Sequence, residues 1–340
     1  MGVTRRDLAL GAGAAALAGC AQQNDMTMPA PRERQFPQDF LWGVATSSFQ
    51  TEGALDADGR GPSIWDVFPR ERIHDGSDAT TANDSYRRYG EDVALIADAG
   101  MNAYRFSIAW PRIVPNADPG AAWAGVNQAG LDYYRRLIDL LLERGVTPYA
   151  TLFHWDLPQA LQARGGWTNR DTAERFAEYA QVVQHFLGDR LKHIVVLNEA
   201  AVHAVLGHVT GMHAPGLQDA SQLGAVIHHQ NLAQGLAIKH LRNARSDMRI
   251  GTTMALMPSR PQRALMPWLN DVAAKAFDEV WNGAFLDPLF RGSYPGAARD
   301  MTKDWVRDGD MAEIRQPIDF LGVNYYAPAY MRFNLSAPSF

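Results

Sequence analysis

Cysteine is nearly absent from the sequence: Cys20 is the only one among 340 residues, and no extended run of basic residues occurs. A single cysteine cannot form a disulfide within the chain, so packing rather than cross-linking must hold the fold together. The apolar stretch that ends near Ala18 is too short to span a bilayer, which takes about 20 apolar residues in a helix. The lack of basic clusters excludes nucleic acid and anionic membrane surfaces as expected partners.

What the chain does contain is typical of a globular protein with one large core. Hydrophobic residues make up 46% of the sequence and charged residues 20%, with a formal net charge of −5. This balance excludes disordered and fibrous classes. Aromatic residues account for 10% of the chain, and flat aromatic faces suit sugar rings as well as protein cores. We expect a small neutral ligand.

Residues 1–19 have the charged start and short apolar stretch of an export signal. The pair Arg5-Arg6 resembles a twin-arginine signal, and a general secretory signal that contains two arginines is the alternative. Cys20 follows Leu-Ala-Gly, which looks like the lipobox of a bacterial lipoprotein and predicts acylation of Cys20. The composition of residues 20–37, rich in Ala, Gln, Asn, Met and Pro, predicts a flexible tether. We therefore expect a periplasmic or cell-surface protein that touches the membrane only through a lipid anchor.

From residue 38 to residue 340 short apolar runs alternate with longer amphipathic segments, which indicates strands that cross into helices. Asn83 and Asn127 are placed to open two helices that Gly100 and Gly145 end. Further helices are predicted near 171–188 and 220–245, and strands near 40–46, 102–108, 146–152, 193–198, 249–254 and 319–324. Nothing in this region indicates an internal domain boundary, so we predict one domain.

Six predicted strands fit either an open doubly wound sheet or part of a closed barrel. Polar and aromatic residues cluster directly after the strands, namely Gln50, Glu52, Trp110, His154, Trp155, Asn198, Glu199, Asn324 and Tyr326. In a (β/α)8 barrel all these strand ends face one mouth, where such enzymes keep their sites. We therefore predict an α/β fold of the (β/α)8 TIM-barrel type in which about six of the eight strands are present.

Several stretches resemble glycoside hydrolase family 1 in order and spacing. They are Phe40–Gly53 (FLWGVATSSFQTEG), Tyr104–Arg112 (YRFSIAWPR), Phe153–Pro158 (FHWDLP), Leu197–Glu199 (LNE), Trp281–Gly292 (WNGAFLDPLFRG) and Asp319–Tyr326 (DFLGVNYY). The resemblance covers about residues 37–330. It implies a (β/α)8 barrel and the hydrolysis of β-linked glucosides or close relatives.

Glycosidic bond cleavage needs a carboxylic acid that protonates the leaving oxygen, and retention of configuration needs a second carboxylate about 5 Å away. The resemblance implies that Leu197-Asn198-Glu199 is the acid/base motif and that Glu199 is the proton donor. The family usually has proline after this glutamate, whereas Ala200 follows it here. The missing proline loosens the next turn and leaves the carboxylate chemistry intact.

Sugar recognition needs polar groups for neighbouring hydroxyls and an aromatic face for the ring. By resemblance, Gln50, His154 and Asn198 supply the polar groups, with Asn198 at the 2-hydroxyl. Trp155 is either a wall of the sugar site or a packed core ring.

The remaining residues that the resemblance singles out support the second carboxylate. Arg105 holds it ionised and Tyr326 orients it, with Asn324 in the same network; a structural role for Arg105 is the alternative. The paired histidines His203/His208 and His228/His229 lack the spacing of metal ligands, so no metal and no cofactor are expected.

The nucleophile of the family lies in a Glu-Asn-Gly motif on a seventh strand, and this sequence contains no Glu-Asn-Gly. Glu52, Glu91 and Glu313 are not expected to replace it. We therefore expect a C-terminally truncated member of the family, a retaining β-glycosidase by descent whose 340 residues alone lack activity. The alternative is a non-catalytic carbohydrate-binding surface lipoprotein.

Overall fold

The computed structural model describes residues 35–117, 123–245, 247–262 and 267–334. The chain divides into two compact units, Met1–Phe40 and Leu41–Phe340. In the first unit the rings of Phe36 and Phe40 lie 4.5 Å apart. The predicted signal over residues 1–19, the lipobox cysteine Cys20 and most of the predicted tether lie outside the described residues.

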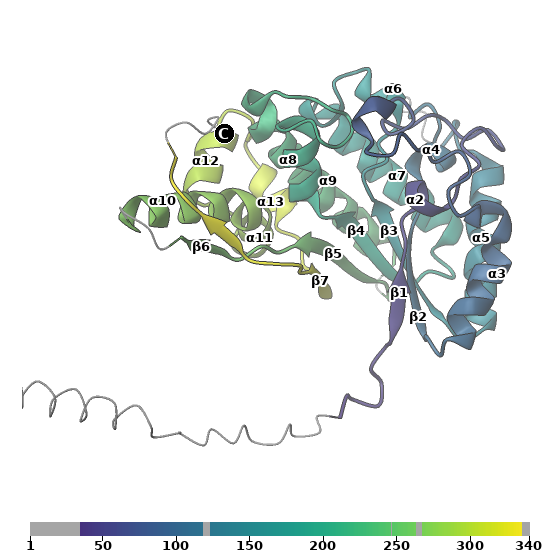
Figure 1. Cartoon of the computed structure of the whole chain (residues 1–340). Coiled ribbons are helices and arrows are strands. Elements are labelled where there is room, and N and C mark those ends of the chain that lie inside the picture. The colour runs from purple at the N-terminus through teal and green to yellow at the C-terminus, as the bar shows by residue number, and fades with distance from the viewer. Residues whose placement is uncertain (1–34, 118–122, 246, 263–266, 335–340) are drawn as a thin grey trace, which may run out of the picture. The chain divides into compact units, whose positions relative to one another are not determined.

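Six parallel strands form one curved sheet in the order β1-β2-β3-β4-β5-β7 (Figure 1). These strands are β1 (Gly43–Ala45), β2 (Ala103–Ser107), β3 (Thr147–Phe153), β4 (His193–Asn198), β5 (Arg249–Ala255) and β7 (Phe320–Asn324). In β4 every residue from Ile194 to Asn198 is buried, as expected of a parallel strand that is covered on both faces. A separate pair joins β6 (Ser259–Pro261) to β8 (Ala329–Met331), also in parallel.

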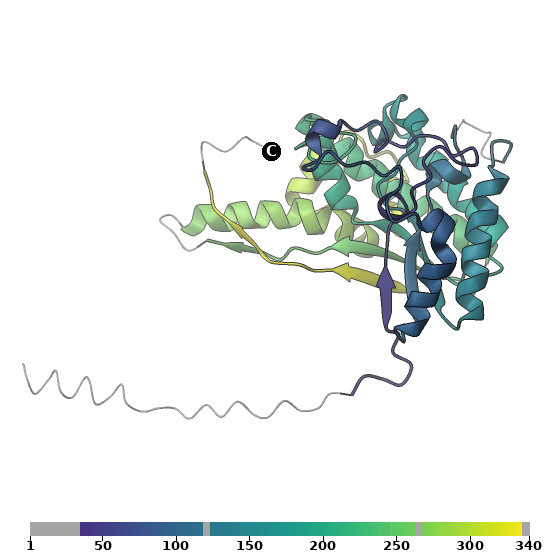
Figure 2. The same cartoon turned by 45° about the vertical axis from the view of Figure 1, so that its right-hand side comes forward.

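Helices follow the strands and cover the outer face of the sheet (Figures 1 and 2). The α-helices are α2 (Ser48–Thr51), α3 (Ser85–Asp98), α4 (Trp110–Ile113), α5 (Gln128–Glu143), α6 (Gln159–Gln162), α7 (Asp171–Leu187), α8 (Ala200–His208), α9 (Leu223–Ala244), α10 (Pro267–Asp278), α11 (Ala284–Arg291), α12 (Gly296–Thr302) and α13 (Asp310–Ile314). Shorter helical turns are η2 (Arg70–Arg72), η3 (Gly166–Thr168), η4 (Ala220–Gln222) and a π-helix, η5 (Glu279–Gly283). Within the described residues no helix is both long and apolar enough to cross a membrane.

The amphipathic patterns account for how these helices pack. Helix α5 buries Leu131, Tyr134, Ile138 and Leu141, which follow one another at three or four positions and therefore share one face. Helix α9 is buried on almost all sides, because α7, α8, α11, α12 and α13 all contact it. The core thus lies between the outer face of the sheet and a continuous helical layer.

The predicted strands all occur, and the helix positions agree within a few residues. Strand β1 is shorter than the predicted run over 40–46. Helix α5 begins directly after Asn127 as expected, but α3 begins after Asp84 rather than Asn83. Strands β6 and β8, the short helices α2, α4, α6 and α8, and the helices α10 to α13 were not among the predicted elements.

The sheet curls like part of a barrel wall, which agrees with the predicted incomplete (β/α)8 arrangement (Figure 2). Strand β1 pairs with β2 only and β7 with β5 only, so these two form the edges of the sheet among the described residues. Because the strands are parallel, their carboxyl ends lie along one rim. This rim carries the residues that follow each strand.

Candidate active site

Arg105, at the centre of β2, links three neighbouring strands. Its Nε donates to Oγ1 of Thr151 on β3 at 2.9 Å, and its Nη2 donates to Oδ1 of Asn198 at the end of β4 at 2.6 Å. Burial lowers the pKa of Arg105, while the nearby Glu199 and Tyr326 oppose this shift. Arginine has no accessible neutral form in proteins, so Arg105 is a fixed positive charge under the site.

Asn198 contacts the residues that follow β3. Its Nδ2 lies 3.1 Å from Nε2 of His154, and its carbonyl oxygen accepts a hydrogen bond from Nε1 of Trp155 at 2.8 Å. Burial, and then the charge of Arg105, lowers the pKa of His154 to about 3. The imidazole is therefore neutral and suited to hydroxyl groups rather than to anions.

Glu199 stands at the turn from β4 into α8 in the left-handed conformation, with φ of 50°. The N–H of Glu199 donates to the carbonyl oxygen of Thr253 on β5 at 2.8 Å. Its side chain is nearly buried, at 6% exposure, and Oε1 accepts a hydrogen bond from Nδ2 of Asn324 after β7. A left-handed residue that is not glycine is costly and occurs often at functional sites. This carboxylate is thus held at the rim by β5 and β7.

Tyr326 follows Asn324 and is 82% exposed. Tyr326 is one of the two groups that oppose the lowering of the pKa of Arg105. No described hydrogen bond of the Tyr326 hydroxyl identifies what it orients. That Tyr326 orients a second carboxylate stays a prediction.

Gln50 lies on α2, and its Oε1 accepts a hydrogen bond from Oγ of Ser47 at 2.6 Å. It shares a cavity of about 550 Å³ with His154 and Trp155. Glu199 does not line this cavity. The predicted site residues therefore form two adjoining groups, one in the cavity and one around Arg105 and Glu199, joined through the contact between Asn198 and His154.

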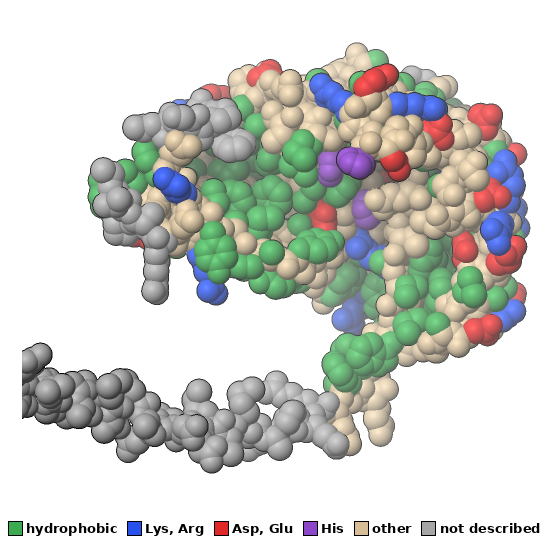
Figure 3. All heavy atoms as spheres, viewed as in Figure 1, with side chains coloured by type: hydrophobic (Ala, Val, Ile, Leu, Met, Phe, Trp, Pro, Cys, Tyr) green, Lys and Arg blue, Asp and Glu red, His purple; other side chains and the backbone are tan. Residues whose placement is uncertain are grey.

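The space-filling view shows the same face of the molecule as Figure 1. Histidine, acidic and basic side chains meet near the middle of a hollow, and hydrophobic side chains extend from there over β5 to β7 (Figure 3). Val323, Tyr325 and Tyr326 are among the exposed large side chains of this region.

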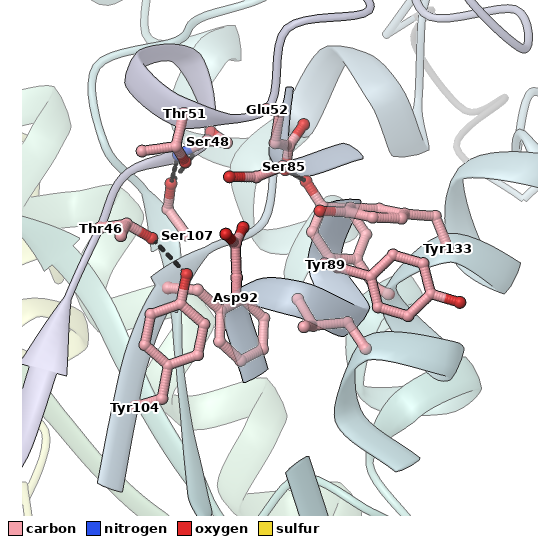
Figure 4. Close-up of a pocket in the computed structure, with 13 residues that line it drawn as sticks. Thr46, Ser48, Thr51, Glu52, Ser85, Tyr89, Asp92, Tyr104, Ser107 and Tyr133 are labelled. Carbon is pink, nitrogen blue, oxygen red and sulfur yellow. Dashed lines mark hydrogen bonds between the residues drawn. The ribbon is translucent and has the colours of Figure 1, made fainter. Parts of the chain in front are cut away.

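Glu52 also follows the first strand, but it points away from this site. Its Oε2 pairs with Nε of Arg112 at 2.9 Å, and its Oε1 accepts a hydrogen bond from the Tyr134 hydroxyl at 2.5 Å. It lines a small internal pocket that also includes Asp92 and Tyr104 (Figure 4). The volume of about 10 Å³ has room for about one water molecule. Glu52 is therefore part of the framework.

The other two glutamates that were not expected to replace the nucleophile, Glu91 and Glu313, lie at the surface. Glu91 pairs with Arg88 along α3, and Glu313 pairs with Lys239 of α9. Neither approaches the site in any described contact.

The histidine pairs also have structural partners. His228 lies between Asp310 and the hydroxyl of Tyr294, at 2.8 and 3.0 Å, and His203 is fully buried beside His208. The described part of the chain contains no group of three residues placed to bind a metal ion.

The sequence did not indicate four aromatic residues of the cavity, Phe49, Trp65, Phe68 and His213. Phe49 lies inside a recognised motif, but Trp65 and His213 lie in irregular segments without periodicity. No pattern in the sequence indicates that these loops return to the end of β3.

The curved parallel sheet, with Glu199 at the carboxyl end of β4 beside amide and imidazole groups, has the arrangement of a barrel-type glycoside hydrolase. The profile of Glycosyl hydrolase family 1 matches residues 32–337. Beta-glucosidase A of Thermotoga maritima is 41% identical over 313 residues, which cover 90% of this chain and 68% of that protein. Thermostable beta-glucosidase B of Thermobispora bispora is 44% identical, with 93% of this chain and 65% of the relative covered. The chain belongs to glycosyl hydrolase family 1.

Solved structures agree with this assignment. A psychrophilic beta-glucosidase from Micrococcus antarcticus matches with a TM-score of 0.83 at 42% identity, covering 89% of this chain and 65% of that one. The Thermotoga maritima beta-glucosidase in complex with deoxynojirimycin matches with a TM-score of 0.79 at 40% identity, covering 87% and 66%. The fold is thus that of the barrel of these enzymes, and the chain spans about two thirds of their length.

Proposed function

We propose that this protein is a retaining β-glycosidase that acts on β-glucosides, with Glu199 as the acid/base residue. The observation that carries the proposal is the position of Glu199: a nearly buried carboxylate at the carboxyl end of β4, held by Asn324. The similarity to beta-glucosidases supports the reaction class. In the first step Glu199 protonates the leaving oxygen, and in the second it takes a proton from water.

The side chains around Glu199 have the chemistry that glycone binding needs. Gln50, His154 and Asn198 offer amide and neutral imidazole groups for hydroxyls, and Trp155 offers a ring face. Because the Asn198 side chain lies between Arg105 and His154, it is fixed beside Glu199. This position suits a contact with the 2-hydroxyl, which strengthens in the transition state.

A retaining mechanism also needs a nucleophilic carboxylate on the other face of the sugar. Arg105 and Tyr326 are the side chains that would hold and orient it. The electrostatic partners of Arg105 are Glu199 and Tyr326, with no second carboxylate among the described residues. We therefore infer that residues 1–340 alone bind and protonate but do not complete double displacement.

Azide provides a direct test, because it can replace the missing nucleophile. Azide attacks the anomeric carbon of an aryl β-glucoside, the bond to the aryl oxygen breaks as that oxygen takes a proton from Glu199, and the products are the phenol and an α-glucosyl azide. We expect the purified chain to release almost no phenol by itself and to form α-glucosyl azide when azide is added.

The variant Glu199→Gln and a surface control, Glu91→Gln, complete this design. With a leaving group that needs protonation, Glu199→Gln should lower the azide reaction by roughly 10²–10⁴-fold, while Glu91→Gln should match the wild type. Unassisted turnover at the level of a full-length relative would contradict the inferred lack of a nucleophile. Failure of azide to react, together with no sugar binding, would contradict the glycosidase site itself.

Export and lipidation are separate proposals that rest on the sequence of residues 1–20. We propose transport by the twin-arginine route and acylation of Cys20, which would place the protein at the periplasmic or cell surface. Incorporation of labelled palmitate that disappears in Cys20→Ala would support the anchor. The double variant Arg5→Lys/Arg6→Lys should block the twin-arginine route but not general secretion.

A non-catalytic carbohydrate-binding lipoprotein is the second candidate. The lack of a second carboxylate beside Arg105 among the described residues favours it. Sugar binding without formation of α-glucosyl azide would be its signature.

A further inference from the structure

Helix α2, which carries Gln50, is too short to hold its own position. It has four residues, from Ser48 to Thr51, and an isolated helix of a single turn is unstable in water. At its C-terminal end the next residue, Glu52, is anchored by its pair with Arg112. The place of Gln50 therefore depends also on what holds the N-terminal end of α2.

The N-terminal end of α2 is held by a chain of buried hydrogen bonds. The N–H of Ser48 donates to Oγ of Ser107, at the end of β2, at 2.7 Å, and Oγ of Ser107 donates to Oγ of Ser48 at 2.9 Å (Figure 4). Oγ of Ser48 donates in turn to Oδ2 of Asp156 at 2.9 Å. All three side chains are buried, so the loss of one of them leaves its partner without a hydrogen bond.

Asp156 belongs to the segment that also contacts Asn198. His154 and Trp155, the two residues before Asp156, contact Asn198 at 3.1 and 2.8 Å. Strand β3 lies between β2 and β4 in the sheet, and Asp156 turns away from β4 to bind Ser48. The end of β3 is thus fixed on both sides, to β4 through Asn198 and to α2 through Asp156.

Gln50 offers an amide group to the cavity that it lines. Its Oε1 accepts a hydrogen bond from Oγ of Ser47 at 2.6 Å, and its NH₂ group has no partner among the described hydrogen bonds. This group can donate to a hydroxyl of a bound sugar. Whether it reaches the same ring as Asn198 is decided by the position of α2.

We propose that Asp156 is a positioning residue of the sugar site: through Ser48 it fixes α2 so that the amide of Gln50 reaches the same sugar ring as Asn198. The contact of Gln50 with the sugar rests on the proposed function. Neither Asp156 nor Ser48 lines the cavity beside Gln50, so both act only through the residues that they hold. What Asp156 supplies is a hydrogen-bond acceptor at a fixed place, which an uncharged amide can supply equally well.

Calorimetry with methyl β-glucoside on the purified 340-residue chain measures this role without turnover. Gln50→Ala should weaken binding about two- to tenfold, as expected for the loss of one hydrogen bond. Asp156→Ala and Ser48→Ala should each cause a loss of similar size. Asp156→Asn keeps an acceptor for Ser48 and should bind as the wild type does.

Double variants separate positioning from a general loss of stability. If Asp156 acts through Gln50, the double variant of Asp156→Ala and Gln50→Ala should bind like Gln50→Ala alone. Ser48→Ala combined with Gln50→Ala should behave in the same way, and this pair keeps the test decisive if Asp156→Ala does not fold. Thr172→Ala is the matched control, because it removes a buried hydroxyl that donates to the carbonyl oxygen of Gly166 at 2.6 Å. It should lower the stability in urea and leave the affinity unchanged.

The possible outcomes are distinguishable. A loss of affinity in Gln50→Ala but not in Asp156→Ala or Ser48→Ala would overturn the positioning role and leave the proposed function in place. Additive losses in the double variants, or an unchanged affinity in Gln50→Ala, would show that Asp156 does not act through Gln50. A loss in Asp156→Asn as large as that in Asp156→Ala would refute the role of Asp156 as an acceptor. Failure of the wild type to bind methyl β-glucoside would contradict the proposed function and the positioning role together.

Discussion

Asn198 is clamped between Arg105 and His154, with its Oδ1 2.6 Å from Nη2 of Arg105 and its Nδ2 3.1 Å from Nε2 of His154. Arginine can only donate, so the oxygen of Asn198 must face Arg105 and its NH₂ group must face His154. Nε2 of His154 then accepts, and the proton of the neutral ring is on Nδ1. The fixed charge of Arg105 on β2 thereby sets the tautomer of His154 after β3.

The first prediction concerns this clamp. Asn198→Ala removes the acceptor of Arg105 and the donor to His154, and buried groups that lose their partners cost about 1–3 kcal/mol each. We expect methyl β-glucoside to bind at least tenfold more weakly by calorimetry. Asn102→Ala is the control, because Asn102 precedes the opposite end of β2 and accepts from the N–H of Trp42. Equal affinities for both variants would contradict the role of the clamp.

The second prediction concerns the buried pair of Glu52 and Arg112, which lie 2.9 Å apart with Arg112 fully buried. Glu52→Ala leaves an unpaired charge in the core, and breaking a buried pair costs about 3–5 kcal/mol. Urea unfolding should show this loss. In the exposed pair of Arg88 and Glu91, Glu91→Ala should leave the free energy of unfolding nearly unchanged, because solvent screens this pair. Similar effects at both positions would contradict a framework role for Glu52.

Much of this architecture follows from local sequence patterns. The buried run of β4 and the amphipathic face of α5 are short-range features, so both elements were predicted close to their bounds. Polar residues after successive strands predicted a common rim, and the contact of Asn198 with His154 confirms that these two strand ends meet.

Other features depend on contacts between distant residues. Nothing in the sequence around Trp65 indicates that it meets His213, which lies in another loop. Likewise, the position of Glu52 after the first strand placed it at the rim, whereas Arg112 and Tyr134 hold it inside the framework. Which way such a side chain turns is decided by its partners and not by its position in the motif.

The third prediction concerns Asp156, which is buried and accepts a hydrogen bond from Oγ of Ser48 at 2.9 Å. Burial raises the pKa of Asp156 to about 6 from 3.8, against the opposing effect of Ser48. The folded state therefore holds this proton more tightly than the unfolded state. The resulting stabilisation is complete below about pH 3.8 and is lost as the pH rises through about 6.

Asp156→Asn is neutral at every pH and keeps an acceptor for Ser48. It should stabilise the protein by roughly 2–3 kcal/mol at about pH 7.5 and by little at about pH 4. Urea unfolding at both values measures this difference, with Asp308→Asn as the control at an exposed aspartate. A gain of equal size at both pH values would show that the effect does not come from the ionisation of Asp156.

The fourth prediction concerns His203, which is fully buried against Phe153 with both ring nitrogens unpaired among the described residues. Burial, with the nearby His208 and His213, lowers the pKa of His203 well below its ordinary value of 6.5. The unfolded state then binds more protons than the folded state, so stability falls as the pH drops below about 6.5.

His203→Leu replaces the ring by an apolar side chain that needs no partner. At about pH 7 its free energy of unfolding should equal or exceed that of the wild type. Between about pH 6 and pH 4 its stability should fall less steeply, by about 1.4 kcal/mol per pH unit, because one proton fewer is taken up on unfolding. Urea unfolding across this range measures the slope, with His74→Leu as the control at an exposed histidine. An unchanged slope in His203→Leu would mean that His203 is already protonated in the folded protein, which its surroundings of Phe153 and neighbouring histidines disfavour.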